Sequence, residues 1–150
     1  MKDSKQELYK LCREFISQKL LTLHTSIADI HEAMNNESKS SAGDKYETAR
    51  EMLEQDLNIQ IVQVNELNKQ RDILDRIDPN IHSEVVVPGS LVKTRSTNYY
   101  IAISAGTLKL NGASYFAISS VSPIGTKLMG QKPGSKIMFN DKEIVIEEIV

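Results

Sequence analysis

The chain is poor in cysteine, in aromatic residues and in long apolar runs. Its 150 residues include one cysteine and no tryptophan, and aromatic residues make up 5%. A single cysteine excludes an intramolecular disulfide, and no apolar run approaches the roughly 20 residues that a membrane helix requires. The first ten residues, MKDSKQELYK, hold no apolar signal core. We therefore expect a cytoplasmic protein without a membrane partner.

The single cysteine and the histidines do not form a recognisable reactive or metal-binding pattern. Cys12 stands among Leu8, Leu11 and Phe15, a setting that predicts a small buried hydrophobic residue rather than a nucleophile. The three histidines have no ligand spacing with one another or with Cys12, and they are His24, His31 and His82. The sequence therefore predicts no metal site or resident cofactor from these residues.

Charge is unevenly distributed along the chain. Residues 1–78 carry 11 Lys/Arg against 15 Asp/Glu, a net charge of −4, and residues 79–150 carry 7 against 5, a net charge of +2. Binding to free duplex nucleic acid requires a clustered basic surface. These counts therefore argue against independent sequence-specific DNA binding and favour a protein partner.

Proline and glycine divide the chain into two parts at Asp78-Pro79. The first 78 residues contain no proline and only Gly43, whereas all four prolines and six of the seven glycines follow. A helical pattern followed by a strand-rich pattern predicts an α+β protein with two domains, 1–78 and 79–150.

The first domain has the pattern of an antiparallel helical hairpin, or coiled coil. Two seams of a/d type are separated by the polar turn-forming stretch 35–43, and each helix should run for about 30 residues, or roughly 45 Å. The first seam contains Ile16, Leu20, Leu23, Ile27, Ile30 and Met34, and the second contains Tyr46, Arg50, Leu53, Leu57, Gln60, Val64, Leu67, Arg71 and Leu74. The hairpin could remain monomeric or pair with a second copy as a four-helix bundle.

The second domain reads as a small twisted antiparallel sheet with one short helix. Two-residue turns are predicted at Asn111-Gly112 and at Asn140-Asp141. Ser122 can cap a helix that has Pro123 at its first position and ends at Gly130. The predicted strands are 91–95, 99–104, 114–119, 135–139 and 142–149.

Two stretches resemble the Gre-type transcription elongation factors, which are transcript cleavage factors of bacterial type. The run SPIGTKLMGQKPGSKIMFNDKEIVIEEI, residues 122–149, is similar to the C-terminal signature of that family. The run DKYETARE, residues 44–51, resembles the family's opening of the second hairpin helix through Tyr46, Ala49, Arg50 and Glu51. The element order agrees over nearly the whole chain.

This resemblance implies a fold, a partner and a role. The C-terminal domain would be FKBP-like and would dock on RNA polymerase at the rim of its secondary channel, while the coiled coil would enter the channel. Ser122, Pro123 and Ile124 would belong to the docking surface, or they would only start a helix over a packed isoleucine. In family members that promote cleavage, acidic tip side chains help to hold a second Mg²⁺ at the polymerase active site. The factor itself would not be an enzyme, and any Mg²⁺ would be shared with the polymerase.

The hairpin tip departs from the family pattern. Alignment through Tyr46 places the family's two acidic positions at Lys39 and Ala42, neither of which can bind a cation. The cleavage chemistry would then be absent or would have moved to the nearby carboxylates of Glu37, Asp44 and Glu47. Asp44 and Glu47 also fit a capping box at the start of the second helix.

Three functional classes remain besides transcript cleavage, and one of them is a structural dimer built through the hairpins. With Lys39 at its tip, the protein would occupy the channel and modulate transcription without recruiting metal. An FKBP-like fold also raises a peptidyl-prolyl isomerase, which would need an aromatic-lined pocket, and fold alone does not confer that activity. The local aromatic residues are Tyr99, Tyr100, Tyr115 and Phe116.

Overall fold

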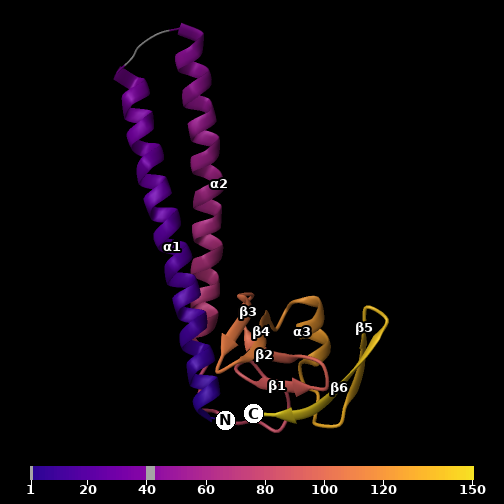
Figure 1. Cartoon of the computed structure of the whole chain (residues 1–150). Coiled ribbons are helices and arrows are strands. Elements are labelled where there is room, and N and C mark those ends of the chain that lie inside the picture. The colour runs from indigo at the N-terminus through magenta and orange to yellow at the C-terminus, as the bar shows by residue number, and fades with distance from the viewer. Residues whose placement is uncertain (1, 40–42) are drawn as a thin grey trace. The chain divides into compact units, whose positions relative to one another are not determined.

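The protein is an α+β structure, as the sequence predicts. The computed structural model describes residues 2–39 and 43–150, with side chains for 4–36 and 47–150 (Figure 1). Two long helices precede a six-stranded sheet that carries one short helix. The elements are α1 (Lys2–Lys39), α2 (Gly43–Asp75), β1 (Leu91–Thr94), β2 (Asn98–Ala102), β3 (Gly106–Leu110), β4 (Ala113–Ser119), α3 (Pro123–Leu128), β5 (Lys136–Phe139) and β6 (Lys142–Ile149).

Residues 16–70 form one of two compact units (Figure 1). This unit is an antiparallel hairpin made from α1 after residue 15 and α2 up to residue 70. The predicted first seam is confirmed, because all six of its residues are buried or half-buried. In the second seam Leu67 is buried and Leu53, Leu57 and Val64 are half-buried. The periodic apolar pattern therefore decides which helix faces meet.

Residues 1–15 and 71–150 form the second unit, which contains the whole sheet. The strand order is β3-β4-β2-β1-β6-β5. The predicted antiparallel pairing is confirmed for four of the five strand pairs, whereas β4 pairs with β2 in parallel. Strand β3 was not predicted from the sequence, and its only buried residue is Leu108. That strand turns the chain round at the edge of the sheet, so that β4 returns between β3 and β2.

The two predicted tight turns are confirmed. Asn111 and Gly112 join β3 to β4 with φ angles of 52° and 81°. Asn140 and Asp141 join β5 to β6 with φ angles of 52° and 63°. Positive φ at both central residues is the type I′ geometry, whose twist matches that of the flanking strands and which Asn, Asp and Gly tolerate best.

The sheet of this unit buries side chains on both faces. On one face Ile101, Ile118 and Ile146 pack with Leu128 of α3. On the other face the strand register aligns Leu91 with Tyr100, Tyr100 with Ala117 and Leu108 with Tyr115. These five residues are all buried, in the same unit as the first turns of α1 and the end of α2.

The ends of the long helices complete the core of this unit. Leu8, Cys12 and Leu74 have no exposed surface. Burial raises the pKa of the Tyr100 hydroxyl well above its usual value, and the nearby Cys12 and Tyr9 raise it further. Residues 2–15 of α1 thus share the buried core of this unit with Tyr100.

Polar contacts tie the start of α1 to the end of α2 and to the residues that follow it. The Lys5 ammonium donates to the carbonyl of Ile81 at 2.5 Å, and the Tyr9 hydroxyl donates to the carbonyl of Leu74 at 2.8 Å. Arg13 forms an ion pair with Asp75 at 2.6 Å. Composition placed a boundary at Asp78-Pro79, whereas contacts group 1–15 with 71–150. The change from helix to strand and the division into compact units thus fall at different points of the chain.

Arg71 lies outside the predicted seam. Its side chain is exposed, although the a/d spacing placed it between Leu67 and Leu74. A guanidinium is always charged and remains hydrated unless it is paired, so the heptad pattern does not bury it. The preceding residue, Gln70, is half-buried, whereas Arg71 is exposed.

The Cys12 thiol is expected to be unreactive in the folded protein. Burial raises its pKa to about 12, and the side chain has no exposed surface, so thiolate is scarce and inaccessible at pH 8. We expect reaction with Ellman's reagent at least 100-fold more slowly than in 6 M guanidinium. The Cys12→Ala variant, which lacks the thiol, sets the background. Equal rates in the folded and unfolded protein would contradict the burial.

Candidate functional site

Two segments carry the residues that the sequence singled out, and they lie in different compact units. Glu37, Lys39, Asp44 and Glu47 belong to the hairpin unit. Ser122, Pro123 and Ile124 belong to the sheet unit. They are therefore described separately, as the hairpin tip and the α3 start.

At the hairpin tip, the helices are longer than the sequence predicts. Helix α1 spans 38 residues and continues to Lys39, and α2 spans 33 residues and begins at Gly43. The predicted loop over 35–43 is therefore wrong for 35–39 and for Gly43, which are helical, while residues 40–42 lie outside the described ranges. Extension of an existing helix costs little per residue, so weak local preferences of Asn and Ser do not stop it.

The charges at the tip match the polarity of the two helix ends. Lys39 occupies the last turn of α1, where a cation is favoured, and Asp44 and Glu47 occupy the first turns of α2, where anions are favoured. Since Gly43 is already helical, Asp44 lies inside α2 rather than at the cap position that a capping box requires. The residues before Gly43, where a cap would be sought, lie outside the described ranges.

The structure describes the side chains of only part of the hairpin tip. Glu47 is exposed, whereas the side chains of Glu37, Lys39 and Asp44 lie outside the described set. Among the described residues, no group of three His, Cys, Asp or Glu side chains is arranged to hold a metal ion. A magnesium-binding role for Glu37, Asp44 and Glu47 therefore stays a prediction.

The α3 start has the cap that the sequence predicts. The Ser122 hydroxyl accepts from the amide of Gly125 at 3.1 Å and donates to the carbonyl of Ser119 at 2.7 Å. Pro123 occupies the first turn, and Ile124 is half-buried against the core cluster of the sheet. Met129 ends the helix, and Gly130 follows with a φ of 78°. Ser122 and Ile124 therefore have structural roles in addition to any contact with a partner.

The solvent-facing residues at the α3 start are Pro123 and Val121. Pro123 is exposed, and Val121 is 79% exposed, the largest value among the exposed large hydrophobic residues described. Val121 was not predicted as a site residue. The available signal was its position, because it is a large apolar residue in a turn after a strand, directly before a Ser-Pro helix start. Of the predicted docking residues, Pro123 is the most accessible.

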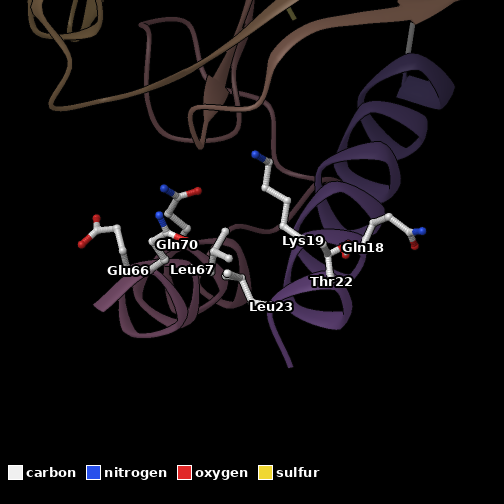
Figure 2. A pocket seen from close by; sticks show the side chains of 8 residues that line it. Gln18, Lys19, Thr22, Leu23, Glu66, Leu67 and Gln70 are labelled. Carbon is white, nitrogen blue, oxygen red and sulfur yellow. Dashed lines mark hydrogen bonds between the residues drawn. The ribbon is translucent and has the colours of Figure 1, made fainter. Parts of the chain in front are cut away.

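A groove lies between α1 and α2 within the hairpin unit. Its volume is about 580 Å³, and six of its eight lining residues are polar or charged, the other two being Leu23 and Leu67, although the surface that lines it is mostly apolar (Figure 2). The side-chain oxygen of Gln70 at its edge is buried without a hydrogen-bond partner, as is that of Gln60. The remaining lining residues are Gln18, Lys19, Thr22, Gln63 and Glu66.

The fold and the two candidate segments define an α+β protein with a helical hairpin and a six-stranded sheet. No protein-family model and no curated protein sequence match the chain. Among solved structures, one described as "Structure of the transcription factor Gfh1" is similar, with 19% identity, 91% of each chain covered and a TM-score of 0.35. A likeness at that TM-score assigns neither a fold nor a function to this chain.

Within the described residues, neither long helix contains a stretch apolar enough to cross a bilayer.

Proposed function

We propose that the chain is an RNA polymerase-binding transcription factor of the Gre type. In this proposal the sheet unit docks at the rim of the secondary channel and the hairpin tip enters the channel. The observation that carries the proposal is that the residues behind the sequence resemblance form the expected elements. Residues 122–149 form the capped helix α3 and the closing strands β5 and β6, and residues 44–51 open α2.

The proposed activity is modulation of transcription through occupation of the channel. Cleavage stimulation in the family depends on tip carboxylates that hold a metal ion, and the two aligned positions are Lys39 and Ala42. A lysine repels a divalent cation at close range, and alanine offers no ligand. The factor contributes no catalytic group of its own in this account, and any Mg²⁺ belongs to the polymerase.

A peptidyl-prolyl isomerase is the less favoured candidate. Tyr99 and Phe116 share one face of the sheet, whereas Tyr100 and Tyr115 lie on the other and are buried. The four aromatic residues therefore do not converge on one pocket. A prolyl-peptide assay with the intact chain would support this candidate if it showed turnover that Tyr99→Ala abolishes.

The proposal is tested with bacterial core RNA polymerase. We expect the chain to bind the enzyme in solution and to alter elongation, without accelerating RNA cleavage in backtracked complexes. The variant Lys39→Asp/Ala42→Glu restores the two acidic side chains and is expected to raise the cleavage rate at least tenfold when Mg²⁺ is present. Lys39→Gln/Ala42→Gln is the matched control without added carboxylates. Absence of binding by the unaltered chain would refute the proposal.

A further inference from the structure

The two hairpin helices differ in how much apolar surface they leave exposed. Leu21 is the one large hydrophobic residue of α1 among those exposed in the described part of the chain, with 61% of its surface accessible. Helix α2 exposes five such residues, which are Met52, Ile59, Ile61, Val62 and Ile73. Both helices contribute buried apolar residues to the shared seam. The difference between them therefore lies in their exposed apolar residues.

Three of these residues form one stripe. Met52, Ile59 and Val62 are separated by seven and three residues, which places them on the same side of a helix. The seam residues Leu53, Leu57 and Val64 lie on a different side and are half-buried. Helix α2 thus has two apolar faces, of which the one formed by Met52, Ile59 and Val62, here named the outer stripe, is exposed. Large exposed apolar side chains at helical spacing are typical of a surface that packs against another element.

The charges around the outer stripe specify the chemistry of its occupant. Glu51, Asp56 and Glu66 are exposed and lie beside or at the end of the stripe, and among the described side chains the nearest cation on this side is Lys69, one turn beyond Glu66. The rim is therefore acidic. A second copy of the same face would place like charges together, which disfavours association, whereas a groove edged by Lys or Arg would be complementary.

We propose that the outer stripe of α2 docks into an apolar protein groove that is edged by basic side chains. The inference rests on the proposed function in one respect, because it assigns that groove to RNA polymerase. Met52, Ile59 and Val62 supply the apolar contact, and Glu51 and Asp56 orient the hairpin through charge. The polar outer surface of α1 then faces water.

Binding of the full-length chain to bacterial core RNA polymerase tests the inference through a matched pair of variants. In Ile59→Gln/Val62→Gln the stripe becomes polar, and in Leu21→Gln an equally exposed apolar residue of α1 is changed. Glutamine favours helix, so both variants should retain the helix content measured by circular dichroism. We expect the stripe variant to bind at least tenfold more weakly and Leu21→Gln to bind within twofold of the unaltered chain. Glu51→Gln/Asp56→Gln should slow association and reduce its dependence on salt.

The outcomes separate the inference from the proposed function. Equal binding by the unaltered chain and the stripe variant would overturn the inference and leave the proposed function standing. Absence of binding by the unaltered chain would overturn both. A dimer in sedimentation velocity that the stripe variant abolishes would also overturn the inference, because a second copy would then occupy the stripe.

Discussion

Substitution of Gly125 by alanine is expected to destabilise the sheet unit by about 3 kcal/mol or more, which is the upper range for an overpacked core site. A Cβ on Gly125 would lie 2.0 Å from the carbonyl oxygen of Ser119 and 2.8 Å from the Ser122 hydroxyl. The near atom is backbone, so no side-chain rotation can relieve the clash. The start of α3 would have to move away from the end of β4.

The movement would also remove the helix cap. The Ser122 hydroxyl links the Gly125 amide to the Ser119 carbonyl, and both bonds depend on the close approach that glycine permits. Loss of a cap alone costs about 1 kcal/mol. Buried Leu128 would lose packing with the core as α3 shifts, which adds to the loss.

Gly130→Ala is the matched control for this substitution. Gly130 has a φ of 78°, but nothing lies within 4 Å of the position of an added Cβ. Its cost should therefore be limited to about 1 kcal/mol of backbone strain. Urea unfolding followed by circular dichroism measures both variants. A Gly125→Ala protein as stable as Gly130→Ala would show that the α3 start is looser than described.

Removal of residues 1–78 is expected to prevent the remaining chain from folding cooperatively. The deletion would remove Leu8, Cys12 and Leu74, all without exposed surface, together with the nearly buried Ile77. Each large buried aliphatic side chain contributes about 2–5 kcal/mol when truncated, and whole-domain stability is of the order of 5–15 kcal/mol. The face of the sheet that carries Tyr100 would become exposed.

A deletion that follows the compact units should behave differently. Replacement of residues 16–70 by a four-residue Gly-Ser linker retains the unit formed by 1–15 and 71–150. It also retains the Arg13–Asp75 ion pair and the hydrogen bond from Tyr9 to Leu74. We expect this variant to unfold in one cooperative transition, whereas 79–150 alone should lack one in thermal denaturation. Cooperative unfolding of 79–150 would contradict a core that depends on α1 and α2.

Much of the fold could be predicted because its signals are local. The spacing of Ile16, Leu20 and Ile30 identified the first seam, and Asn111-Gly112 and Asn140-Asp141 identified two turns by the φ angles they tolerate. The parallel pairing of β2 with β4 could not be predicted in this way. It follows from β3, whose pattern holds only Leu108 as a buried residue and resembles a polar loop.

The candidate site was less accessible to sequence reasoning, for a physical reason. Ser122 and Pro123 were found because capping has strict local chemistry, but the close approach of Gly125 to Ser119 depends on tertiary packing. The outer stripe and the buried seam lie in the same stretch of α2, so the sequence contains two overlapping apolar patterns. Only the exposed surface of Ile59 and Val62 distinguishes the two faces.

The position of the hairpin tip in a complex with RNA polymerase tests the central proposal most directly. A photo-crosslinking amino acid at Glu47, which is exposed near the start of α2, would report the tip, and one at exposed Lys132 would report the sheet unit. With bacterial elongation complexes, we expect Glu47 crosslinks to map to the lining of the secondary channel near the active site. Lys132 crosslinks should map to its outer rim. Glu47 crosslinks confined to the outer surface of the polymerase, or none at all, would contradict the account.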